Sequence, residues 1–137
     1  MINFKKLIKN FGFAFVGLKE AASEQTFRIF IVAAMLVVVL MFVFDVSHYE
    51  KLILVLIITI VVTLELINSR IERILDIFQP DYDERVRIIK DISAGAVLLA
   101  CLGAAVIGFL IFWPYFQTFS FDKNLSIINY VLCPKFI

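Results

Sequence analysis

The chain has 137 residues, of which 62% are hydrophobic and 18% charged, and its mean hydropathy is +0.97. This composition is too apolar for a soluble domain of the same length, so we expect a single membrane domain. The formal net charge of +1 leaves no surplus of basic residues to neutralise phosphates, which excludes a nucleic-acid-binding protein. The two cysteines, Cys101 and Cys133, are too few for a disulfide framework or a metal box.

The first segment, residues 4–23, is predicted to be an amphipathic helix on the membrane surface. Its aromatic and aliphatic residues recur at helical spacing on one side, and Lys5, Lys6 and Lys9 lie largely on the other. A helix of this kind lies in the plane of the interface with its lysines near anionic headgroups. We expect the segment to anchor the chain without spanning the membrane.

Three apolar segments follow, and each is predicted to form a transmembrane helix. The expected spans are residues 28–45, 51–78 and 90–113. The short turn "DVSHYEK" makes a hairpin of the first two. Between the second and third, Pro80 breaks the helix and a fresh helix begins beyond Asp81 and Asp83. Pro114 is expected to end the third span.

The placement of lysine and arginine predicts the orientation in the membrane. Five basic residues precede the first span and five lie between the second and third, against one in the first turn and two in the C-terminal tail. The excess of positive charge marks the cytosolic side. We therefore expect the N-terminus in the cytosol and the C-terminus outside.

The second span carries polar side chains at its end, although the preceding turns are apolar. At about 100° per residue, Glu65, Asn68, Glu72 and Asp76 fall within about 80° of one another, so they form one stripe along the helix. Glu65 and Glu72 lie about 10 Å apart along the axis, which suits two separate tasks. An ionisable group at this depth usually marks a functional path. The alternative for Glu65 is a packing role at an ordinary helix end.

Other charged residues around the spans have simpler expected roles. Arg70 and Arg73 fall beside the stripe or away from it, and we expect them to reach toward lipid headgroups. Glu24 and Arg28 are four residues apart and are expected to form an intrahelical ion pair. Lys90, at the start of the third span, is suited to contact phosphate as a point charge.

Carboxylates and lysines that share one interface suit phosphoryl transfer. Mg²⁺ is commonly held by one or two carboxylates together with substrate phosphates. The reaction itself needs positioning, charge neutralisation and an oriented nucleophile. The chain has neither a Walker A loop nor a kinase-type glycine-rich loop, so a nucleotide site must be built differently.

A set of short motifs follows in a fixed order along the chain. These are "SEQTFRIF", "ELINSRIE", Asp76, "PDYD" and "KDISAGAVLL", within roughly residues 4–113. Together they resemble the small bacterial integral-membrane diacylglycerol kinase and undecaprenol kinase family. The resemblance implies a homotrimer of three-span protomers with shared active sites, in the bacterial cytoplasmic membrane. It also implies MgATP-dependent phosphorylation of a lipid alcohol by a domain at residues 1–113, with an extension at 114–137 of no assigned role.

The same resemblance implies roles for individual residues. Glu65 would act as the general base, and Asn68 would support the active site. Glu24 and Glu72 would hold Mg²⁺ on ATP. The further expected nucleotide contacts are Lys6, Asp81, Tyr82, Asp83, Lys90 and Asp91.

Three alternatives stay open. The lipid substrate is either undecaprenol or diacylglycerol, and "KDISAGAVLL" is more similar to the undecaprenol kinase branch. A small oligomeric pore or holin-like protein would also be short and apolar, but it would spread polar residues along its spans. A non-catalytic family member acting as a membrane partner is favoured by Arg70 and Arg73, which stand where the family usually has small residues.

Overall fold

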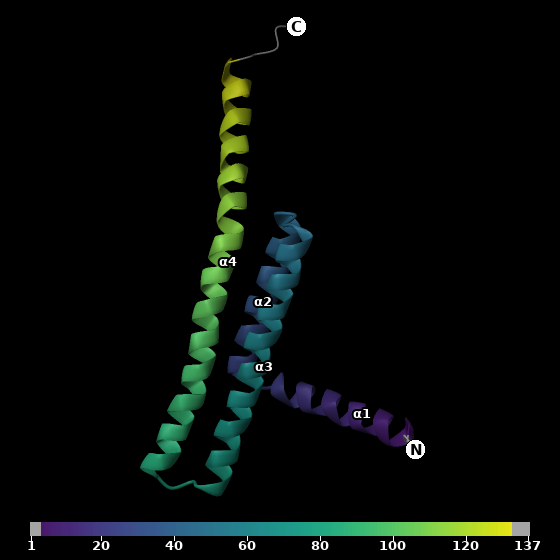
Figure 1. Cartoon of the computed structure of the whole chain (residues 1–137), viewed down its shortest axis with the longest axis vertical. Coiled ribbons are helices and arrows are strands. Elements are labelled where there is room, and N and C mark those ends of the chain that lie inside the picture. The colour runs from purple at the N-terminus through teal and green to yellow at the C-terminus, as the bar shows by residue number, and fades with distance from the viewer. Residues whose placement is uncertain (1–3, 133–137) are drawn as a thin grey trace.

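The computed structural model describes the backbone of residues 4–132 and the side chains of residues 4 and 8–118. All secondary-structure elements of the described residues are helices, as predicted. Its elements are α1 Phe4–Ala21, α2 Gln25–Val43, α3 His48–Phe78 and α4 Glu84–Leu132. The helices α2, α3 and α4 run up and down in one elongated bundle, and α1 projects from it at a steep angle (Figure 1).

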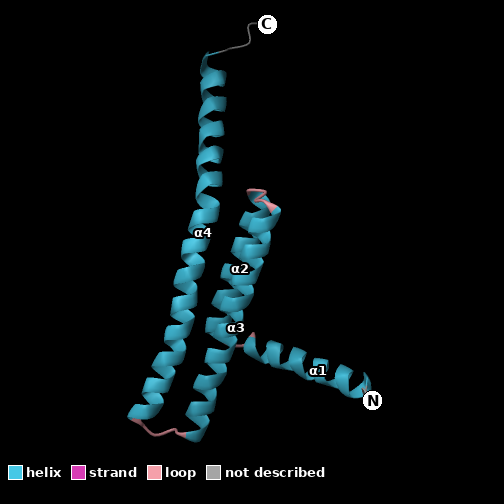
Figure 2. Ribbon diagram, viewed as in Figure 1, coloured by secondary structure: helices cyan, strands magenta, loops and turns pink. Residues whose placement is uncertain are grey.

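Three helices are long and apolar enough to cross a membrane. The candidate spans are Gln25–Val43, His48–Phe78 and Glu84–Thr118. They confirm the three predicted segments, although each helix begins earlier than predicted. Short connections join successive helices at opposite ends of the bundle (Figure 2), so neighbouring spans are antiparallel.

Capping residues explain the early start of two helices. Ser47 precedes α3, where its N–H donates to Glu50 Oε2 at 2.8 Å and its Oγ accepts from the Glu50 N–H at 3.4 Å. This reciprocal arrangement is a capping box. At the start of α4, Asp83 Oδ1 accepts the Arg85 N–H at 2.8 Å. Both caps satisfy backbone donors that a helix start leaves free.

The prediction that Pro114 ends the third span is wrong. The helix α4 continues through Pro114 as far as Leu132. Proline removes one backbone donor, but membrane helices tolerate this when local groups compensate. Thr118 Oγ1 donates to the Pro114 carbonyl oxygen at 3.1 Å, one turn further along the same helix. Cys133 lies outside the described residues, as do the side chains of residues 119–137.

The central helix α3 packs against both α2 and α4, whereas α2 and α4 contact each other much less. The apolar core lies near the α2–α3 turn and contains Met41, Val46, Leu54 and Ile111. Most other apolar side chains of the three spans are exposed, which gives the bundle a surface suited to lipid chains.

The α2–α3 turn is fixed by polar contacts above this core. Asp45 has a φ of 42°, a left-handed conformation that aspartate tolerates better than most residues. Its carboxylate lies 3.0 Å from Lys51 Nζ. The Tyr115 hydroxyl donates to Glu50 Oε2 at 2.6 Å and accepts the Ser47 N–H at 3.2 Å. These contacts tie α4 to the turn.

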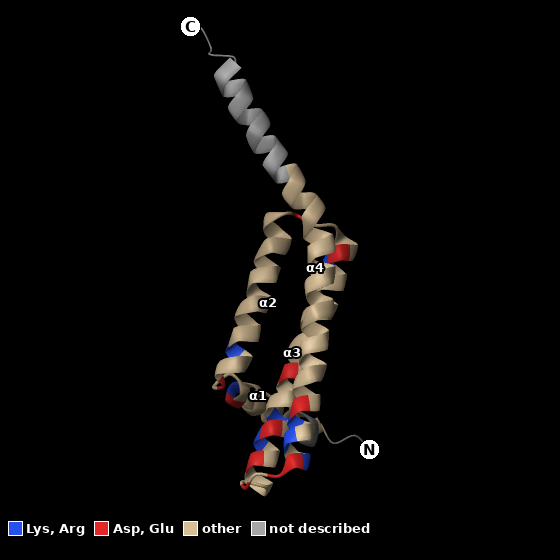
Figure 3. Ribbon diagram, turned by 90° about the vertical axis from the view of Figure 1, so that its left-hand side faces the viewer, with Lys and Arg blue, Asp and Glu red and all other residues tan. Residues whose placement is uncertain are grey.

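Most charged side chains gather at the other end of the bundle. Figure 3 shows the charged residues coloured on the ribbon around α1, the end of α3 and the start of α4, with a smaller group at the α2–α3 turn. The stretch between Lys51 and Glu65 has no charged residue. The fold therefore separates an apolar core at one end from a polar region at the other.

The helix α1 covers most of the predicted surface segment. Its described side chains are exposed except that of Ala21, which is fully buried at the junction with α2. Ser23 stabilises this junction, because its carbonyl oxygen accepts a hydrogen bond from Arg28 and its hydroxyl donates to the Glu20 carbonyl oxygen at 2.6 Å. The location of α1 on the membrane surface stays a prediction.

Candidate active site

A polar cavity of about 640 Å³ opens between α2, α3 and α4 at the charged end. All four members of the predicted stripe line it. The lining residues are Glu24, Thr26, Phe30, Glu65, Asn68, Ser69, Glu72, Arg73, Asp76, Ala94, Val97, Leu98 and Cys101. The helical periodicity of α3 thus places the stripe correctly against a cavity.

Glu65 is the most deeply buried carboxylate of this cavity. It is only 2% exposed, and the Ser69 hydroxyl donates to its Oε1 at 3.3 Å. The hydroxyl lies one turn further along the same helix and holds the carboxylate in place. A buried, ionisable group with a second oxygen left for another partner is suited to take up a proton.

Asn68 connects α3 with α4. It is 8% exposed; its Nδ2 donates to Glu72 Oε1 at 3.2 Å, and its Oδ1 accepts from the Ser93 hydroxyl at 2.7 Å. Asn68 therefore orients Glu72 while it is itself held by α4. Ser93 has no role in the sequence analysis, and its one distinguishing feature there is a hydroxyl at the start of an apolar run.

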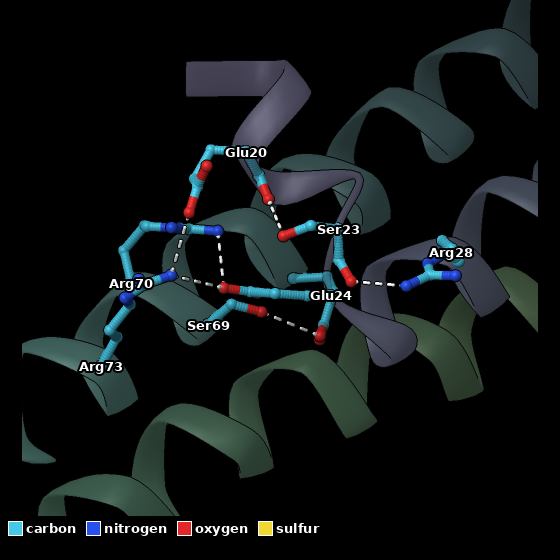
Figure 4. Close-up of polar contacts among 8 residues, drawn as sticks. Glu20, Ser23, Glu24, Arg28, Ser69, Arg70 and Arg73 are labelled. Carbon is cyan, nitrogen blue, oxygen red and sulfur yellow. Dashed lines mark hydrogen bonds and ion pairs between the residues drawn. The ribbon is translucent and has the colours of Figure 1, made fainter. Parts of the chain in front are cut away.

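Glu24 faces α3 from the junction of α1 and α2. Its Oε1 accepts a hydrogen bond from Arg70 Nη2 at 2.8 Å and lies 3.7 Å from Arg73 Nη1. Figure 4 shows both arginines directed toward Glu20 and Glu24. The predicted Glu24–Arg28 pair is wrong, because Arg28 donates instead to the Ser23 carbonyl oxygen.

The prediction that Arg70 and Arg73 reach toward headgroups is also wrong. Arg70 is bound to Glu24, and Arg73 lies 3.5 Å from Glu20 and lines the cavity. A helical wheel of α3 places both side chains beside the stripe. It contains no information on the carboxylates that the α1–α2 junction brings to the same side.

Lys90 lies at the edge of the cavity and forms an ion pair with Asp76. This pair joins the end of α3 to the first turns of α4. Asp91, the neighbour of Lys90, is exposed and accepts a hydrogen bond from Arg87 at 3.3 Å. The fold therefore brings Lys90 to the stripe, whereas Asp91 is not among the lining residues.

The predicted contacts in the α3–α4 connection do not line the cavity. Tyr82 is 79% exposed, and its hydroxyl donates to Glu84 Oε2 at 2.6 Å. Asp83 caps α4, and the hydrogen bonds from Arg85 hold the pKa of its carboxyl below the usual value. Asp81 lies in the same connection. The side chain of Lys6 is outside the described residues.

An apolar groove of about 330 Å³ continues from the polar cavity into the apolar part of the bundle. Phe30 and Cys101 line both spaces. Small residues leave the groove open where α2 and α4 face each other: Ala33, Ala34, Ala104, Ala105 and Gly108. A Cβ atom added at Gly108 would meet nothing within 4 Å, so no helix packs closely on this position.

The carboxylates of the cavity do not form a metal site by themselves. Within the described part of the chain, no three His, Cys, Asp or Glu residues are grouped so that they could hold a metal ion. Glu24 and Glu72 nevertheless line one cavity. Two carboxylates fit a Mg²⁺ ion that is carried mainly by substrate phosphates.

The bundle has three helices able to span a membrane and a polar cavity at one end. Residues 12–112 match the model of the family described as prokaryotic diacylglycerol kinase. The chain belongs to this family and is a lipid kinase, as the motifs predict. This membership favours an enzyme over the pore-like protein considered above.

Similar proteins occur in several bacteria. The diacylglycerol kinase of Escherichia coli (strain K12) is 32% identical over 114 residues, which cover 82% of this chain and 93% of that protein. The undecaprenol kinase of Bacillus subtilis (strain 168) is 33% identical over 110 residues, covering 80% and 89%. The two relatives are named for different lipid alcohols, although their sequence identities to this chain are nearly equal.

Proposed function

We propose that the protein transfers the γ-phosphate of ATP to the hydroxyl group of a membrane lipid alcohol, with Glu65 as general base. The burial of Glu65 is the observation that supports this most directly. Its carboxylate lines a polar cavity that shares Phe30 and Cys101 with an apolar groove. A molecule with a polar head and a long apolar tail matches this pair of spaces.

The proposed reaction is a direct displacement at phosphorus. The lipid hydroxyl lies beside Glu65 and its tail occupies the apolar groove. Glu65 accepts the hydroxyl proton as the lipid oxygen bonds to the γ-phosphorus, and the bond to the bridging oxygen of ADP breaks. The products are a lipid phosphate and ADP.

Mg²⁺ would reach the site on the nucleotide. Glu24 and Glu72 would hold it, and the ion neutralises phosphate charge when bound. Asn68 supports this role, since its hydrogen bond to Glu72 fixes the direction of that carboxylate. The donor set of two carboxylates in a polar cavity fits this ion.

The rest of the nucleotide extends toward the α3–α4 connection in this proposal. Lys90 would contact phosphate after exchange of its partner Asp76. Asp91 and the exposed residues of the connection, Asp81, Tyr82 and Asp83, would contact the outer part of ATP. Lys6 would approach from α1.

The proposed enzyme is a homotrimer with shared sites and with the cavity on the cytosolic side. The family resemblance supports the trimer, and the many basic residues near the cavity support the orientation. Mass determination of the detergent-solubilised protein tests the proposed trimer. Labelling of single cysteines placed in the 79–83 connection, in intact and in opened cells, tests the proposed cytosolic location of the cavity.

The test of the function is phosphate transfer by the purified protein in mixed micelles. Diacylglycerol and undecaprenol are offered separately with ATP labelled at the γ-phosphate and Mg²⁺, beside a Glu65→Gln control. Labelled lipid with the unchanged protein and none with the variant supports the proposal. No product from either lipid, with the protein intact, contradicts it and favours a non-catalytic membrane partner.

A further inference from the structure

The polar cavity has an excess of negative charge. Four carboxylates line it, and Arg73 is the only arginine or lysine among its described lining residues. The nucleotide phosphates of the proposed function would add further negative charge. Mg²⁺ offsets part of it, and a cation of the protein must offset more if the phosphates are to stay close to Glu65 and Glu72.

The two arginines of α3 differ in how firmly they are held. Arg70 Nη2 is 2.8 Å from Glu24 Oε1, and the side chain of Arg70 is 33% exposed. Arg73 Nη1 is 3.5 Å from Glu20 and 3.7 Å from Glu24, and its side chain is 54% exposed. Exposed ion pairs with such long N···O distances contribute little to stability, so Arg73 can exchange its partners easily.

The two carboxylate oxygens of Glu24 differ in their contacts. Both arginines contact Oε1. A guanidinium and a metal ion on the same oxygen would repel each other, whereas Oε2 is left for a metal ion carried on the nucleotide. The departure of Arg73 from Glu24 would remove a nearby positive charge that repels the metal ion, and it would not loosen the Arg70 contact.

We propose that Arg73 is a phosphate-binding residue that moves from Glu20 and Glu24 onto the terminal phosphate of the nucleotide, while Arg70 stays on Glu24 as a positioning residue. This inference rests on the proposed function and deepens it. A guanidinium presents paired N–H donors that match phosphate oxygens, and in phosphoryl transfer such a group neutralises charge on the transferred phosphoryl.

The test measures nucleotide binding without turnover, because binding can be followed even if no lipid is phosphorylated. The full-length protein in detergent micelles is titrated by calorimetry with Mg²⁺ and the non-hydrolysable analogue AMP-PNP, and separately with ADP. The variants are Arg73→Gln and Arg73→Lys. Lys19→Gln is the matched control, since it removes one positive charge from the exposed side of α1.

We expect Arg73→Gln to weaken AMP-PNP binding by about 10-fold or more, the usual effect of losing a hydrogen bond between charged groups. ADP lacks the terminal phosphate, so its binding should change by about 2-fold or less, the size of a remote charge effect. Arg73→Lys should recover part of the AMP-PNP affinity. Lys19→Gln should bind both nucleotides as the unchanged protein does.

Three other results separate a failure of this inference from a failure of the proposed function. Equal affinity of Arg73→Gln and the unchanged protein for AMP-PNP, or an equal loss for AMP-PNP and ADP, overturns the role of Arg73 and leaves the kinase proposal intact. No binding of either nucleotide by the unchanged protein overturns the proposed function and this inference together. Unchanged elution volume and thermal midpoint show that each variant is folded.

Discussion

The Tyr115 hydroxyl lies 2.6 Å from Glu50 Oε2, so α4 is tied to the start of α3 at the end of the bundle farthest from the polar cavity. Glu50 and Glu65 are about 22 Å apart along α3, since a helix rises about 1.5 Å per residue. This hydrogen bond therefore concerns the stability of the bundle, and the chemistry at Glu65 is remote from it.

Tyr115→Phe tests this separation. We expect its thermal midpoint to fall by a few degrees, because Glu50 and the Ser47 N–H lose a shared partner. The kcat at a temperature where the protein stays folded should be unchanged. Tyr49→Phe is the control, since Tyr49 is 78% exposed, and it should leave the midpoint unchanged. Equal midpoints for both variants would contradict the prediction.

Glu65→Gln tests the general base. The amide keeps the shape of the side chain but cannot accept the hydroxyl proton, so we expect kcat to fall by about 100-fold or more. AMP-PNP affinity should stay within about 2-fold, because Glu65 is not a proposed nucleotide ligand. Glu50→Gln removes a carboxylate from the other end of α3 and should lower stability without this loss of kcat. A fully active Glu65→Gln enzyme would exclude the proposed mechanism.

Asn68 and Ser93 are expected to act as a coupled pair between α3 and α4. A double-mutant cycle with Asn68→Ala and Ser93→Ala, measured as free energy of unfolding, should give a coupling energy of about 1 kcal/mol. Asn68→Ala should also lower kcat, because Glu72 loses the donor that orients it. Strict additivity of the two substitutions would show that their 2.7 Å contact does not stabilise the protein.

The apolar groove is tested by filling it. Gly108→Leu places a side chain in the groove, and no atom blocks the first carbon of that side chain. We expect the KM for the lipid to rise by about 10-fold and the KM for ATP to stay unchanged, since only the tail would be displaced. Gly103→Leu is the matched control, because Gly103 does not line the groove. Equal lipid KM values for both variants would place the tail elsewhere.

The Asp83 cap predicts a dependence of stability on pH. Hydrogen bonds from Arg85 lower the pKa of this carboxyl, so its contribution is complete above the ordinary aspartate range and is lost as the pH falls through the lowered pKa. Asp83→Ala should therefore unfold at a lower temperature than the unchanged protein at neutral pH, and the difference should shrink on strong acidification. Asp81→Ala provides the comparison. A difference that grows with acidity would contradict the assignment.

The periodicity of one helix was sufficient to predict which polar side chains share a cavity. Glu65, Asn68 and Glu72 line the same cavity because the register of an α-helix is fixed by its geometry. The contacts of Arg70 were not predictable in this way, since its partner Glu24 is 46 residues away and is placed by the α1–α2 junction. The role of Ser93 was not predictable for the same reason, because its partner Asn68 lies on another helix.

Pro114 shows a different limit of local rules. Proline ends many helices in water, where an unmade backbone bond is readily replaced by solvent. A non-helical backbone is costlier in a membrane span than in water, and the helix continues through Pro114. A rule drawn from helices in water therefore fails at this position.

The apolar core around Met41, Val46 and Leu54 lies at one end of the bundle and the polar cavity at the other. The proposed chemistry and the contacts that stabilise this core are therefore at opposite ends of the bundle. Resistance to heat and catalytic power can accordingly evolve, or be engineered, almost independently. Substitutions that stabilise the α2–α3 turn and the core around Val46 should therefore leave the carboxylates of the cavity untouched.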